Sequence, residues 1–198
     1  FLFFMVQFSY SQLSKTHYIP PLTTKSTGNN PPNEQWFHIS TPSEIPVNFT
    51  IRRGDGSVFY SDNVTNTDPW TGRANLSDNN NDLYGYLFAS ENETEQLLTQ
   101  HGFIIEADQE IYVSLRFISG SNNHAGALVS KGESALGTRF RAGSLQVGSG
   151  HLSFVSLMAT EDNTLVSFDL STAILSGQNG LLNVGPLSRG QSYVVAVD

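Results

Sequence analysis

The segment from Glu110 to Phe117 alternates polar and apolar residues without interruption. Successive side chains of a β-strand point to opposite faces, so four apolar residues would form a single face: Ile111, Val113, Leu115 and Phe117. No other stretch of the chain alternates so cleanly. A strand with one apolar face needs a second layer against that face, and the segment therefore predicts a packed β-structure.

Three parts of the chain share a pattern of two short apolar runs separated by a polar turn. They cover residues 35–51, 102–117 and 152–168, with turns expected at 41–44, 107–109 and 160–164. Their uneven spacing argues against a solenoid or a propeller, which would repeat at a fixed interval. The pattern predicts an all-β fold, in the form of an antiparallel, hairpin-rich β-sandwich or of two packed sub-sandwiches.

One segment carries the signals of a helix. Ser90 and Glu93 have the spacing of a capping box, and Gly102 stands where a helix C-cap could lie. The sequence therefore predicts at most one short helix, between Ser90 and Gly102.

The first 34 residues differ in composition from the rest of the chain. Residues 1–11 form a short apolar run with small residues at its end, which indicates the remnant of a secretory signal peptide; a buried N-terminal strand is the alternative. Residues 12–34 are rich in Pro, Thr and Asn and predict an extended lead-in that can supply one edge strand. Residues 35–198 form the expected β domain, which we expect to be truncated because the run at 190–197 resembles a strand that stops mid-fold.

Charge and cysteine content exclude several classes of function. The net charge is -8 and the ten Lys and Arg residues are scattered, which argues against a nucleic-acid partner. The chain has no Cys, so thiol catalysis and thiolate metal sites are excluded, and the core must be stabilised by hydrophobic burial. No apolar run in the sequence is long enough to span a bilayer as a helix.

Candidate catalytic groups lack a supporting context. The stretch Gly132–Gly137 is one residue too long for a nucleophile elbow, and no βαβ pattern surrounds it. The five His residues are far apart and do not have the spacing of a zinc site. Two acidic pairs are each expected in a solvated turn, where both carboxylates stay ionised: Glu161 with Asp162, and Asp108 with Glu110. The sequence therefore predicts no catalytic residues and a protein that is not an enzyme.

The segment 63–82 contains no convincing strand and is predicted to be a long surface loop, where binding functions concentrate. Trp70 is its best candidate for ligand contact, because a Trp in a turn between Pro and Gly is hard to bury completely. Tyr84 and Tyr86 follow it and would extend an aromatic platform. We expect Trp36, by contrast, to lie in the core.

The same segment carries a weak metal pattern. Asp78, Asn80 and Asp82 have the alternating spacing of oxygen ligands in a calcium loop. Leu83 occupies the place where an EF-hand needs Gly, and Ala89 stands where its bidentate Glu would be. The sequence thus suggests no cofactor beyond calcium bound by these three residues.

Five stretches of the sequence together resemble the N-terminal domain of IgGFc-binding-type proteins: Ser14–Pro21, Gly102–Ala107, Ala125–Gly132, Ala135–Phe140 and Ala159–Thr164. The resemblance is to the bacterial branch found in large secreted proteins of gliding Bacteroidota, which typically carry C-terminal type IX sorting domains. It extends over residues 14–198 and is poorest over residues 63–100.

This resemblance implies an extracellular, β-rich module that serves binding or adhesion at the cell surface, within a larger secreted protein. It brings no known catalytic residues. The expected partner is an extracellular protein or a glycan. The alternative is a secreted carbohydrate-binding or carbohydrate-active protein, with Trp70 and Tyr84 against the sugar and the acidic pairs as catalysts; a purely structural spacer is a third reading.

Overall fold

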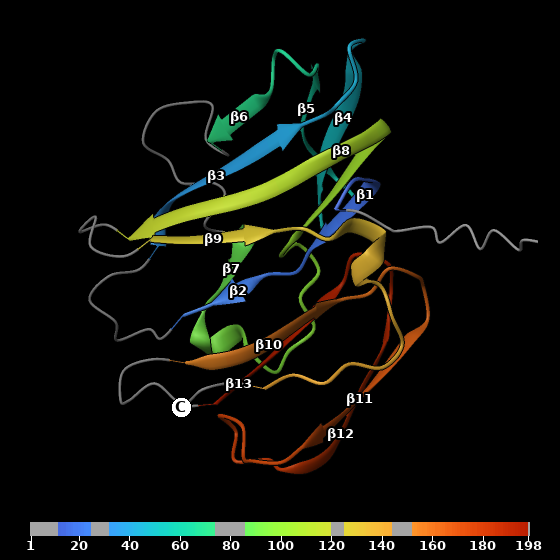
Figure 1. The fold of residues 1–198 in the computed structure, drawn as a ribbon. Helices are drawn as coiled ribbons and strands as arrows, with labels where there is room; N and C mark the ends of the chain where they lie inside the picture. The colour runs from blue at the N-terminus through green and yellow to red at the C-terminus, as the bar shows by residue number, and fades with distance from the viewer. Residues whose placement is uncertain (1–11, 25–31, 74–85, 120–124, 144–151, 198) are drawn as a thin grey trace, which may run out of the picture.

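The computed structural model describes residues 12–24, 32–73, 86–119, 125–143 and 152–197. Its strands are arranged in three layers, with a large sheet above, β10 and β13 in the middle, and β11 and β12 below (Figure 1). All the paired strands are antiparallel except for one pair of two-residue strands. The predicted all-β, sandwich-like fold is confirmed.

The large sheet contains seven strands: β1 (Ser14–Ile19), β3 (Pro32–Ser40), β4 (Val47–Arg53), β5 (Val58–Val64), β6 (Trp70–Arg73), β8 (Phe103–Ser119) and β9 (Ala125–Val129). The strand order is β5-β4-β8-β3-β6, and β1 and β9 also pair with β8. The apolar core of this sheet is formed by fully buried residues from β3, β4 and β8, such as Phe37, Ile51 and Phe103.

The strand β8 is continuous over 17 residues, and the predicted turn at 107–109 is wrong. Its first half pairs with β1 and β4, and its second half pairs with β3 and β9. Because both halves of β8 are paired, the polar residues 107–109 between them stay extended. The burial alternation is interrupted here, because Asp108, Gln109 and Glu110 are all exposed, but Ile105 and Ile111 on either side are both buried at odd-numbered positions. A polar run in the middle of a strand was mistaken for a turn.

The strands that follow one another in the predicted units do not form hairpins. β3 and β4 pair with different halves of β8 and not with each other, so the turn at 41–44 joins strands that are not paired. The hairpin in this region is β4–β5, closed by Asp55 and Gly56. Gly56 has a φ of 83°, and the Arg53 N–H donates to the Ser57 carbonyl at 3.0 Å. Asp-Gly between two apolar runs is a strong sequence signal for such a hairpin.

The remaining strands form the C-terminal sandwich, which comprises the pair β10 (Ser153–Met158) and β13 (Ser192–Val197) and the pair β11 (Thr164–Leu170) and β12 (Gly180–Leu187). The polar turn predicted at 160–164 exists, and Asn163 adopts a left-handed φ of 60°. It joins β10 to β11 in the next layer, because each strand pairs with a different partner. The turn is therefore a corner between layers.

The middle layer has two apolar faces. Val155, Leu157 and Val195 pack against β11 and β12 in one core. Phe154 and Val194 lie on the opposite face and pack with Ala89 and Leu98 in another. The β10–β13 pair is thus covered on both faces, which explains why its alternation is less clear than that of β8.

Short elements complete the fold. The lead-in supplies the edge strand β1, as expected, and also β2 (Leu22–Thr23), which pairs in parallel with β7 (Phe88–Ala89). The predicted short helix is a 3-10 turn, η1 (Glu91–Glu93), with the capping box between Ser90 and Glu93 in place. A second 3-10 turn, η2 (Gly132–Ala135), follows β9.

The large sheet and the C-terminal sandwich meet through close backbone contacts. A Cβ atom added at Gly190 would overlap the carbonyl of Gly54, and Leu98 forms an isolated bridge with Ser192. Glu106 of β8 accepts hydrogen bonds from Arg52 at 3.0 Å and from Arg189 at 2.8 Å. These contacts fix how the two parts are oriented.

A comparison of two glycines tests the close contact at this junction. Gly190 (φ 87°) and Gly177 (φ 84°) have nearly the same backbone conformation, but only Gly190 faces another backbone segment. Gly177→Ala should cost about 1 kcal/mol for its left-handed conformation. Gly190→Ala should cost about 1–3 kcal/mol more, because the methyl group would push the two parts apart. Urea unfolding followed by circular dichroism measures both, and equal losses would contradict the close contact.

Candidate functional site

The outer face of the large sheet carries a row of half-exposed polar and aromatic side chains on β3 and β8. Phe37 and Ile39 are completely buried, so the alternate residues Trp36 and His38 point outward. On β8 the buried residues alternate in the same way with three outward residues. We call the group the Trp36 face: Trp36, His38, Tyr112, Ser114 and Arg116.

The register of β3 and β8 brings these residues together. Trp36 is the partner of Arg116, and His38 is the partner of Ser114. Directly opposed side chains in antiparallel strands have Cβ atoms about 4.5–5.5 Å apart. Tyr112 lies opposite Ser40 at the next pair along and is 40% exposed. From Tyr112 to Arg116 the face is about 14 Å long at the strand rise of about 3.4 Å per residue.

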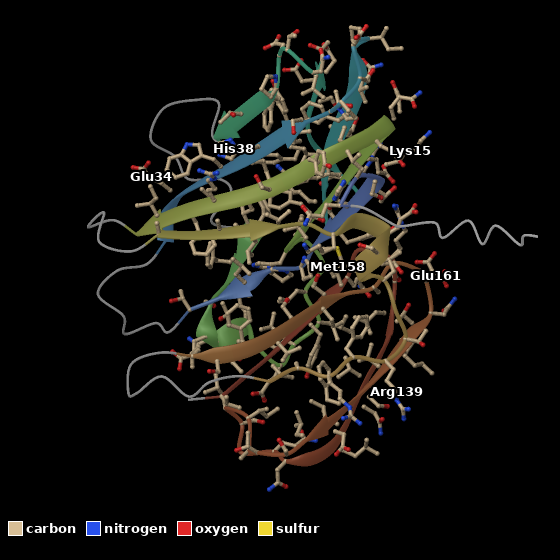
Figure 2. All side chains as sticks on the ribbon, viewed as in Figure 1. Lys15, Glu34, His38, Arg139, Met158 and Glu161 are labelled. Carbon is tan, nitrogen blue, oxygen red and sulfur yellow. The ribbon has the colours of Figure 1, made fainter. Side chains whose placement is uncertain are left out.

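The electrostatics of the face depend on His38 and Arg116. Figure 2 shows the side chains of His38 and Glu34 projecting outward from β3. Partial burial lowers the pKa of His38, and the nearby charge of Arg116 lowers it further. His38 is thus neutral at pH 7, and its Nδ1 lies 3.0 Å from the Thr71 Oγ1 of β6. The face offers an aromatic ring, a guanidinium and several neutral hydrogen-bonding groups.

Trp36 was predicted to be a core residue, and that expectation is wrong. The buried neighbour is Phe37, while Trp36 keeps part of its surface exposed. The signal that identifies the outer face was present in the sequence. Phe37 and Ile39 match the spacing of the apolar residues of β8, so the residues between them had to point the other way.

The segment 63–82 is not simply a loop, because Trp70–Arg73 forms β6 and pairs with β3. The Trp70 ring stacks on Tyr60 of β5 with centroids 5.0 Å apart, and meets Phe49 edge-on at 5.3 Å. Its Nε1 donates to the Tyr60 hydroxyl at 3.4 Å. Trp70 thus joins the two end strands of the sheet order, β5 and β6. The segment 70–73 forms a strand because the edge of β3 that does not face β8 offers it a partner.

The other predicted ligand contacts do not gather around Trp70. Tyr86 is half-buried, with the guanidinium of Arg53 4.3 Å above its ring and Phe59 as its aromatic neighbour. Tyr84 lies outside the described residues, as do the three predicted calcium ligands, Asp78, Asn80 and Asp82. Within the described ranges, no three metal-ligating side chains are clustered. The roles proposed for these residues stay predictions.

The two acidic pairs occupy different surroundings. Asp162 and Glu161 are exposed in the corner between β10 and β11, where the Asp162 Oδ1 accepts from the Arg189 N–H at 2.9 Å. Asp108 does not lie in a turn, as was expected for it and Glu110, but in the middle of β8. Its Oδ2 accepts from the Asn48 amide at 2.6 Å.

A Ser–His contact that the sequence did not indicate lies under β1. His17 is completely buried, with Nδ1 2.8 Å from the Ser130 Oγ and Nε2 3.0 Å from the Ile111 carbonyl. Burial lowers the pKa of His17, so the neutral ring donates from Nε2 to that carbonyl and accepts from Ser130. A substrate cannot reach the buried ring. The contact therefore has a structural role, in which it joins β1 to β8 and to the end of β9.

The buried His17 predicts a loss of stability in acid. Its pKa in the folded chain lies below the unfolded value of 6.5, so unfolding takes up a proton as the pH falls below about 6.5. The free energy of unfolding should then fall by up to about 1.4 kcal/mol per pH unit until the folded pKa is reached. His17→Gln keeps a donor and an acceptor but cannot titrate.

The variant and the wild type should therefore diverge in pH dependence. Both retain His38 and His101, whose contributions cancel in the comparison. Urea unfolding at a series of pH values between 7.5 and 5 measures the difference. Identical slopes for the two proteins would show that His17 is not held neutral by the fold.

Comparisons with protein-family models, curated proteins and solved structures found no match to this chain. Among the residues that the structure describes, no helix has the length and apolar character needed to cross a membrane. The geometry of the described residues therefore carries the argument about function.

Proposed function

We propose that this chain is a non-catalytic binding or adhesion module that holds an extracellular partner against the Trp36 face. The observation that carries the proposal is the outward row of Trp36, Arg116 and Tyr112 on a rigid sheet. Trp, Tyr and Arg are the residue types that contribute most to protein–protein binding energy. A protein partner is the ligand that these residue types fit best.

The central position of these residues in the sheet supports the proposal. β3 and β8 are each paired on both sides, so their outward side chains stand on a backbone that is fixed by neighbours. Binding residues on such a support lose little conformational entropy when a partner docks. The buried residues directly beneath them, Phe37 and Leu115, anchor the same strands in the core.

The extracellular location is part of the proposal. The signal-peptide pattern of residues 1–11 and the resemblance to IgGFc-binding-type domains support a module that is secreted or displayed on the cell surface within a larger protein. No nucleic acid is proposed as a partner, because the chain is acidic overall.

A glycan is the second candidate ligand. An indole such as that of Trp36 can lie against the apolar face of a sugar ring, while Arg116, Ser114 and neutral His38 supply hydrogen bonds to its hydroxyls. This form of the proposal moves sugar binding from Trp70, whose ring is stacked on Tyr60, to the outer face of β3.

Arrays of extracellular proteins and of glycans, probed with the purified chain, test both candidates. For any ligand found, Trp36→Ala and Tyr112→Ala should each weaken binding by about tenfold or more, which corresponds to about 1.4 kcal/mol. Leu181→Ala is the matched control, because Leu181 is 65% exposed on β12 and lies in a different layer. A ligand that binds both face variants as tightly as the wild type would refute the proposed site.

A further inference from the structure

The strand β10 is paired on one edge only. All six of its residues pair with β13 in an unbroken register, and no other strand of the described residues pairs with it. β13, by contrast, also bonds on its far side, where the Val194 carbonyl accepts from Glu95 and the Ala196 carbonyl accepts from Leu175. No strand of the described residues therefore pairs with the other edge of β10.

The phase of the hydrogen bonds shows which groups lie on that edge. Val194 and Ala196 bond away from β10, so the residues between them bond toward it. The Ala159 N–H donates to the Gln191 carbonyl at 2.9 Å, so the odd-numbered residues of the two segments bond to each other. In the register of the pair, the N–H and C=O groups of Phe154, Ser156 and Met158 must then point outward.

This edge lacks the features that keep strand edges from pairing. β10 has the sequence Ser-Phe-Val-Ser-Leu-Met, with no charge, no Pro and no Gly, and it has no register shift. Three strands at other edges have both a charged residue and a register shift, in β1 (Lys15), β5 (Asp62) and β11 (Asp169). β10 resembles a strand that is used for pairing.

The centre of the edge holds a second unsatisfied group. The Ser156 Oγ is buried and has no hydrogen-bond partner within the described part of the chain. An unpaired buried hydroxyl costs about 1–3 kcal/mol, so a structure in which it is satisfied is favoured. Ser156 shares its face of β10 with Phe154 and Met158, and Met158 extends from β10 toward the large sheet (Figure 2).

We propose that the free edge of β10 pairs with the same edge of a second copy of this chain, antiparallel about a two-fold axis at Ser156. Phe154 then lies opposite Met158 of the second copy, and Ser156 lies opposite its own counterpart. All three pairs are of the kind that exchange both backbone hydrogen bonds, because the three residues point outward.

The register also places the two Ser156 side chains opposite each other, and each must rotate about χ1 to bring its buried hydroxyl to the interface. Two Ser side chains directly opposite each other in an antiparallel pair have Cβ atoms about 5 Å apart, which allows one hydroxyl to donate to the other. The same pairing joins two uncharged strands, so it brings no like charges together although each chain carries a net charge of -8. A second copy therefore fits both the backbone and the side-chain requirements of this edge.

Proline substitutions at the outward positions test the proposal without removing backbone hydrogen bonds inside the chain. Ser156→Pro and Phe154→Pro each delete an outward N–H, whereas Val155→Pro deletes one that bonds to β13. Light scattering after size exclusion should give the wild type twice the mass of a single chain, and both outward variants the mass of one chain. Ser156→Pro should keep the wild-type circular dichroism. Phe154→Pro also loses the packing of its ring against Ala89 and Leu98 and, like Val155→Pro, should lower the unfolding midpoint.

A measurement on the unmodified chain covers the case in which a variant does not fold. Amide hydrogen exchange at Phe154, Ser156 and Met158 should slow as the protein concentration rises, because only the paired edge is protected. A wild type of single-chain mass at every concentration overturns the proposal. So does a folded Ser156→Pro variant that keeps the double mass, or exchange at these three amides that is independent of concentration.

Discussion

The length of β8 is the constraint on which the rest of the fold depends. One strand of 17 residues pairs with four others, two along each half, and it supplies core residues from Phe103 to Leu115. Phe103 and Ile105 in the first half and Val113 and Leu115 in the second are all buried at odd-numbered positions, because a slip of one residue between the halves would turn the later side chains to the wrong face. The outward residues Tyr112, Ser114 and Arg116 take their positions from the same alternation. The core and the Trp36 face are two consequences of one register.

Aromatic packing connects the two end strands of the large sheet, which do not pair with each other. β5 and β6 lie at opposite ends of the strand order, yet Tyr60 and Trp70 stack across the interval between them. The indole can lie against its own strand because residue 72 is Gly, whose missing side chain leaves room for the ring. The aromatic rings thus provide the lateral contact that backbone hydrogen bonds do not supply at this point.

The sequence predicted the class of the fold and the positions of β3, β4, β8, β10, β11 and β13, because alternation is a local property. It did not predict which strands pair, because pairing depends on partners that are distant along the chain. β3 and β4 are separated by only six residues in sequence, yet each pairs with a different half of β8 and they do not pair with each other. The same limit applies to the site. Trp70 looked exposed when only Pro69 and Gly72 were considered, and its partner Tyr60 lies in another strand. Trp36 looked buried beside Phe37, although their opposite faces followed from strand geometry.

The junction between the large sheet and the C-terminal sandwich has a consequence for valency. Contacts at Gly54 with Gly190, at Leu98 with Ser192 and at Glu106 with Arg189 are spread over the junction and oppose rotation of one part against the other. In a pair of chains joined through β10, the two Trp36 faces would therefore keep a constant separation and angle. Such a pair would gain avidity only from ligands whose repeat matches that spacing, because a rigid connector cannot adjust its reach.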